Sequence, residues 1–80
     1  MTALYVLDVP ENTTVAKVAA EAGAAVGKVG PYFEITSDGP IVVDRRATGC
    51  RHAVWYSCIA GVAGGEIVQH DKNALQVDPA

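Results

Sequence analysis

The spacing of apolar residues changes several times along the 80-residue chain. Residues 3–9, ALYVLDV, form an apolar, β-rich run that Pro10 ends, which predicts a first strand. Asn12 or Thr13 is then positioned to cap a helix, and Gly23 supplies its stop. Between them, apolar residues recur at helical spacing, at Val15, Val18, Ala19 and Ala22. The N-terminal pattern therefore predicts a strand, a turn and a helix of about three turns.

The helical spacing is lost in residues 24–31, which contain Gly27, Gly30 and Pro31. We expect an extended connection there rather than a second helix. Residues 32–36 and 41–45 are then predicted to pair as a hairpin. The dipeptide between them, Asp38-Gly39, suits the positive φ angles of a tight turn.

Residues 51–63, RHAVWYSCIAGVA, are the longest β-like run of the sequence and predict a long strand. Gly64-Gly65 follows as a second hairpin signal that leads into residues 66–70. A two-residue turn would place Ile59 opposite His70, whereas a three-residue loop would place Cys58 there, and the sequence leaves both registers open. A short final strand is expected at residues 74–77.

This order of elements predicts an α+β fold in which one short helix packs on a mainly antiparallel twisted sheet of five to six strands. Residues 6–23, VLDVPENTTVAKVAAEAG, resemble the strand-turn-helix start of β-grasp domains, including plant-type ferredoxins. That resemblance implies the fold only, because the cysteine series that holds the ferredoxin cluster is absent. A β-grasp arrangement and a partly open barrel both fit, and residues 1–80 are expected to form a single small domain.

Residues 14–29, TVAKVAAEAGAAVGKV, resemble the helix-turn-helix of Lac-repressor-type proteins, which implies DNA binding. The second helix would contain Gly27, Gly30 and Pro31, and the segment has only two basic residues, Lys17 and Lys28. The net charge of the chain is −3. We therefore expect no nucleic-acid partner.

The N-terminus has no basic leader and reaches Asp8 before any long apolar run, so we expect a cytoplasmic protein without a membrane partner. Two cysteines are too few for a disulfide framework, and no cofactor motif is present. Half of the residues are apolar, and a chain this short cannot bury them all in its own core. The chain is therefore predicted to form a homo-oligomer or to dock as an accessory subunit on a larger protein.

The candidate chemistry lies in one short stretch, GCRH. Positive neighbours favour the thiolate of a cysteine, so Cys50 is a candidate nucleophile with His52 as its base. The alternative is that Cys50, like Cys58, is a small buried apolar residue. A zinc site that combined these side chains with His70 is not expected, because a straight strand separates them.

All three arginines of the chain lie within seven positions, at Arg45, Arg46 and Arg51. Arginine binds carboxylates and phosphates through paired hydrogen bonds. Together with His52 and Trp55, Arg45 and Arg51 therefore form the predicted site for a small anionic or aromatic ligand. Strand alternation would separate Trp55 from His52, and a tryptophan in such a strand is more often a core or interface anchor than a residue that stacks on a ligand. A ligand-binding accessory domain is the main prediction, and a small enzyme that uses Cys50 and His52 is the alternative.

Overall fold

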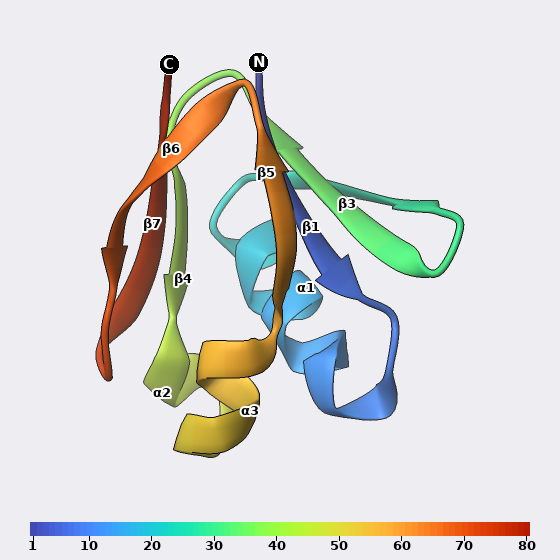
Figure 1. Cartoon of the computed structure of the whole chain (residues 1–80), viewed down its shortest axis with the longest axis vertical. Coiled ribbons are helices and arrows are strands. Elements are labelled where there is room, and N and C mark those ends of the chain that lie inside the picture. The colour runs from blue at the N-terminus through green and yellow to red at the C-terminus, as the bar shows by residue number, and fades with distance from the viewer.

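The computed structural model describes residues 1–80 and contains seven strands, three α-helices and one short 3-10 helix (Figure 1). In chain order these are β1 (Thr2–Leu7), η1 (Pro10–Asn12), α1 (Thr13–Glu21), β2 (Ala25–Val29), β3 (Tyr32–Ser37), β4 (Ile41–Asp44), α2 (Arg45–Thr48), α3 (His52–Ser57), β5 (Ile59–Ala63), β6 (Gly65–His70) and β7 (Ala74–Pro79). All strand pairs are antiparallel. The predicted α+β class is confirmed.

The strands belong to two sheets, with the orders β2-β3-β1-β5 and β4-β7-β6. The sheets diverge from a shared end where the chain passes from β5 to β6 (Figure 1). Helix α1 lies behind the opening between them, and α3 lies across its lower end (Figure 1). The sheets do not close into a barrel, because β5 and β6 do not pair with each other.

The beginning of the chain follows the prediction closely. Strand β1 leads through η1 into α1, whose buried side chains are Val15, Ala16 and Ala19. Gly23 has a φ of 105°, a backbone conformation that favours glycine and ends the helix. Asn12 occupies the N-cap position but forms no capping bond. Its side-chain amide instead donates to the carbonyl of Leu7 at 3.0 Å, which ties the helix start to the end of β1.

Both predicted hairpins are wrong. Strand β3 pairs with β1 and β2, and β4 pairs with β7, so Asp38-Gly39 links two sheets instead of two neighbouring strands. The second glycine pair is also a corner between sheets, since Ile59 pairs with Val6 and His70 with Leu75. Neither predicted register of that turn occurs.

The predicted long strand at residues 51–63 is also wrong. Its first part forms α3, in which the backbone N–H of Trp55 donates to the carbonyl of Arg51 at 2.8 Å, and only its last part forms β5. The link upstream of it contains the single-turn helix α2. The expected connection at residues 24–31 holds strand β2, which pairs with β3. Local β propensity is overridden at α3 by the packing of its tryptophan.

The core fills the space between the two sheets and α1. Leu4, Val6 and Ile35 enter it from the first sheet and Val77 from the second, and each is fully buried. Burying an aliphatic side chain of this size contributes about 1.5–3 kcal/mol relative to leaving it exposed. No helix of the chain combines the length and the apolar character needed to cross a membrane.

Gly64, at the corner between the sheets, is predicted to be essential for stability. Its φ is 68°, and a Cβ atom there would collide with the backbone carbonyl of Met1. We expect Gly64→Ala to lower the free energy of unfolding by at least about 2 kcal/mol. Gly39→Ala is the control, because nothing lies within 4 Å of its Cβ position and its φ is not positive. Urea unfolding of both variants checks this, and equal midpoints would contradict it.

Candidate functional site

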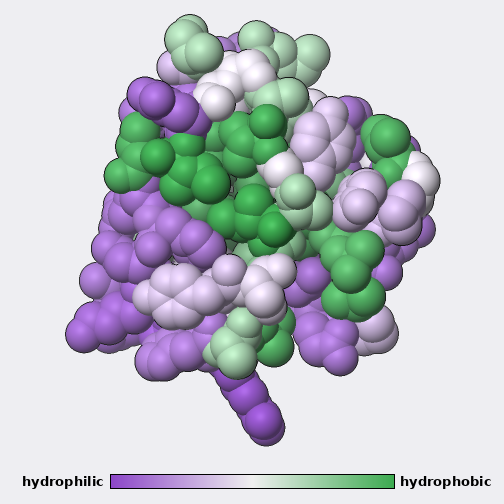
Figure 2. Space-filling view, in the orientation of Figure 1, coloured by the Kyte–Doolittle hydropathy of each residue, from purple (hydrophilic) through white to green (hydrophobic).

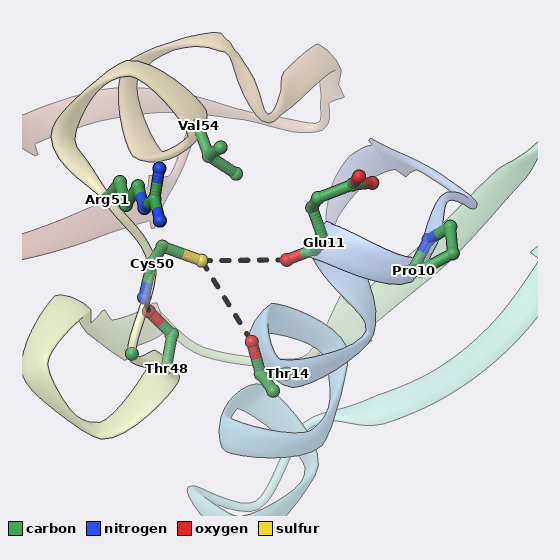
Figure 3. A pocket seen from close by; sticks show the side chains of 8 residues that line it. Pro10, Glu11, Thr14, Thr48, Cys50, Arg51 and Val54 are labelled. Atoms are coloured by element: carbon green, nitrogen blue, oxygen red, sulfur yellow. Dashed lines mark hydrogen bonds between the residues drawn. The ribbon is translucent and has the colours of Figure 1, made fainter.

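A cavity of about 310 Å³ lies where the start of α1 faces the link between α2 and α3 (Figure 3). Its lining comprises Pro10, Glu11, Thr14, Thr48, Gly49, Cys50, Arg51 and Val54. The first three come from the turn before α1 and from its first turn, and the others come from the opposite wall. The cavity therefore joins two parts of the chain that are far apart in sequence.

Cys50 is held at the cavity by the backbone around it. Gly49 ends α2 with a φ of 70°, which turns the chain toward α1. The hydroxyl of Thr48 donates to the carbonyl of Arg45 at 2.6 Å and accepts the N–H of Cys50 at 3.1 Å. These bonds direct the thiol across the gap, where Sγ lies 3.7 Å from the carbonyl oxygen of Glu11 (Figure 3). The cysteine is 7% exposed.

The three arginines, of which Arg45 and Arg51 belong to the predicted site, have different environments. Arg45 donates from Nη1 to the carbonyl of Cys50 at 3.3 Å and from Nε to the carbonyl of Lys72, so it braces two backbone segments. Arg46 is exposed, and its backbone N–H donates to Oδ1 of Asp44 at 3.2 Å. Arg51 lies at the cavity and is exposed (Figure 3). Only Arg51 is placed to meet a ligand in this cavity.

His52 and Trp55 do not line the cavity. His52 is exposed at the start of α3, and the hydrogen-bond partners of Cys50 Sγ are Glu11 and Thr14. Trp55 is fully buried, and its indole N–H donates to the carbonyl of Asp71 at 2.6 Å. In the predicted strand His52 and Trp55 would lie on opposite faces, and in helix α3 they are also apart, with His52 in solvent and Trp55 in the core.

The second cysteine is a core residue, as its apolar neighbours predict. Cys58 is 2% exposed, and its thiol donates to the carbonyl of Trp55 at 3.0 Å. Burial raises the pKa of the Cys58 thiol from 9.0 to about 11, and the negative charge of an ionised Cys50 adds to the increase. Cys58 is therefore protonated near neutral pH.

Several cavity residues had no signal in the sequence. Pro10, Glu11 and Thr14 belong to a turn and a helix start that carry no chemical motif, and their proximity to Cys50 depends on α2 and α3. No group of three or more histidine, cysteine and acidic side chains is arranged to hold a metal ion. The cavity accordingly presents a thiol, a hydroxyl and the charges of Glu11 and Arg51 to a small polar ligand.

No protein-family model and no curated protein matches this sequence. Among solved structures, the chain is similar to one chain in the structure of a phenol hydroxylase–regulatory protein complex. The TM-score is 0.78 at 13% identity, and the match covers 99% of this chain and 98% of the other. The two proteins therefore share a fold over their whole lengths.

The two cysteines are predicted to differ strongly in reactivity. At pH 8 a thiol with a pKa of about 11 is ionised about a hundredfold less than one with a pKa of 9.0. We expect Cys50→Ser, which retains Cys58, to react with iodoacetamide at least about a hundredfold more slowly than a free cysteine. Cys58→Ser, which retains Cys50 beside the cavity, should react faster. Mass spectrometry of timed samples measures both, and equal rates would contradict the assignment.

Proposed function

We propose that this chain is an accessory subunit that docks on a larger enzyme. In its most specific version, the proposal is that this enzyme is a multicomponent hydroxylase. The main support is the full-length likeness to a chain in the phenol hydroxylase–regulatory protein complex. Because the match covers nearly all of both chains, that chain is also a small protein of about this length. A shared fold alone does not transfer function, so the surface must supply a second reason.

Exposed apolar side chains provide this second reason. Nine large apolar side chains are at least 36% exposed: Met1, Leu7, Val26, Val29, Tyr32, Val42, Tyr56, Ile67 and Val68. Figure 2 shows apolar surface gathered on the face that β5 and β6 present. Contiguous apolar surface of this kind is typical of protein interaction sites. Docking on a larger protein would cover it.

The alternative to docking on a larger enzyme is that copies of the chain associate with one another as a homo-oligomer. It would also bury apolar surface, and most soluble oligomers are built from identical subunits. Light scattering of the purified chain distinguishes the two forms, because docking predicts a monomer of 8.3 kDa.

The cavity beside Cys50 supports an additional proposal, that the subunit binds a small anionic ligand through Arg51. A thermal-shift screen of carboxylates and phosphates, with Arg51→Ala as the control, tests it. The enzyme alternative requires His52 to act as the base for Cys50. It is less favoured, because the thiol contacts a carbonyl and a hydroxyl and not His52.

The docking proposal predicts that the tagged full chain, expressed in its native cells, co-purifies with a larger enzyme in a fixed ratio. Adding the purified chain to that enzyme should change its turnover at least severalfold and should saturate at a defined ratio. Native mass and a turnover assay measure the two effects. A stable homo-oligomer without a larger partner, or a turnover that is independent of the chain, would contradict docking on a larger enzyme.

A further inference from the structure

We infer that the end of the molecule formed by α2, the link before α3 and the β6–β7 turn binds an acidic surface on a larger protein. This inference rests on the proposed accessory function and specifies the chemistry of the contact. The surface is called the basic end below, and its cationic residues are Arg45, Arg46, Arg51 and Lys72.

The basic end joins segments that are distant in sequence. Arg45 and Arg46 begin α2, Arg51 precedes α3, and Lys72 lies in the turn between β6 and β7. The guanidinium of Arg45 connects them, because it donates to the backbone carbonyls of Lys72 and Cys50. Figure 1 shows α2, α3 and the β6–β7 turn together at the lower end of the molecule, and Figure 2 shows hydrophilic surface there. Folding therefore collects the four cations at one end.

Charge is distributed unevenly between this end and the rest of the chain. Residues 44–51 and 71–73 contain four of the six basic residues but only two of the nine acidic ones. The rest of the chain has seven acidic and two basic residues, so the net charge of −3 hides a positive end. Complementary charge across an interface selects partners and accelerates their encounter.

The cations of the basic end form no ion pairs. The single salt bridge of the chain joins Lys28 to Asp8. The two carboxylates within the basic end bond to other groups instead. Asp44 accepts the backbone N–H of Arg46 at 3.2 Å, and Asp71 accepts backbone N–H groups of its own turn. The positive charges therefore remain available to an external carboxylate.

The basic end is an open surface and is distinct from the cavity beside Cys50. Only Arg51 of its four cations lines that cavity, and Glu11 on the opposite wall forms no ion pair with it. Arg46, Arg51 and Lys72 are all exposed. The planar guanidinium of arginine matches the two oxygens of a carboxylate. Exposed cations from three segments suit several carboxylates on a protein better than one small anion.

The charge of the remaining chain favours an acidic protein over other partners. A nucleic acid presents a continuous array of phosphates, which the seven acidic residues elsewhere on this small chain would repel. A second copy in a two-fold contact at this surface would bring two basic ends against each other, which is unfavourable. A local acidic patch on a different protein avoids both conflicts.

Charge reversal at equal net charge tests the basic end. Arg46→Glu and Lys72→Glu each replace one of its cations. Lys17→Glu is the matched control, because it changes the net charge equally at an exposed residue of α1 that forms no ion pair. The Kd is measured for the larger enzyme that co-purifies with the full chain. We expect each basic-end variant to raise it at least about tenfold and the control less than about threefold.

Folding and salt provide the checks on these variants. Circular dichroism confirms that each variant is folded, and the two basic-end positions test the surface independently if one variant is not. Raising the salt concentration should weaken binding of the unmodified chain, because salt screens exposed charges. It should weaken binding of the double variant of Arg46→Glu and Lys72→Glu less.

Carbodiimide cross-linking identifies the chemistry of the partner. The reagent activates a carboxylate, which then forms an amide bond with an adjacent lysine amine while the carbodiimide leaves as its urea. Arg46→Lys keeps the positive charge and adds a second reactive amine beside Lys72. We expect both amines, and not that of Lys17, to be linked to aspartate or glutamate of the larger enzyme. Mass spectrometry of the linked peptides measures this.

The outcomes separate the inference from the proposed function. An unchanged Kd for both basic-end variants, or an equal loss from Lys17→Glu, would overturn the basic end and keep the accessory function. Amide links to a second copy, or a shift of duplex DNA mobility that depends on Arg46 and Lys72, would overturn the stated partner. The absence of any co-purifying enzyme would overturn both.

Discussion

The burial of Trp55 is the interaction on which the rest of the structure depends. Its indole N–H donates to the carbonyl of Asp71, beside the turn between β6 and β7. Its own carbonyl accepts the thiol of Cys58 and lies 3.3 Å from Nε2 of His70, whose ring packs edge-on to the indole. A single residue thus joins α3 to the second sheet through polar bonds and aromatic contact. Aromatic residues of this size bury more surface than aliphatic ones, so they dominate the energetics of a small core.

This position of α3 determines how the sheets are arranged. With the helix across the lower end of the core, β5 begins at residue 59 and runs back along β1 (Figure 1). The chain then turns at Gly64, where the amide of Ala80 also donates to the Gly64 carbonyl at 3.1 Å, and β6 enters the other sheet. The corner directs the two strands apart, so they cannot pair. The separation of β5 from β6 is therefore a consequence of the same packing that buries the tryptophan.

The sequence predicts those helices and strands whose conformation depends on their own residues. It does not predict those whose conformation depends on contacts with distant parts of the chain. Strand β1, helix α1 and the stop at Gly23 follow from residues within each element, and the α+β class follows from their order. Helix α3 could not be predicted, because HAVWYS has β propensity and becomes helical where Trp55 reaches a carbonyl 16 residues away. Both hairpins failed because the choice between a hairpin and a corner depends on strands elsewhere in the chain. The candidate site was divided for the same reason: Cys50 and Arg51 line a cavity, whereas His52 and Trp55 face solvent and core.

The small size of the chain limits how much apolar surface it can bury by itself. Only 16 of the 80 residues are buried, and domains of this length bury about 60% of the surface of their unfolded chains. Closing the opening between the two sheets from within would require β5 and β6 to pair, and they diverge at the corner at Gly64. Burial beyond this amount would require contact with another molecule. Helix α3 lies between the cavity and the second sheet. Val54 lines the cavity, whereas Tyr56 packs against His70 at the end of β6, with ring centres 5.1 Å apart. Val54 and Tyr56 thus lie on different sides of one six-residue helix that Trp55 holds in place.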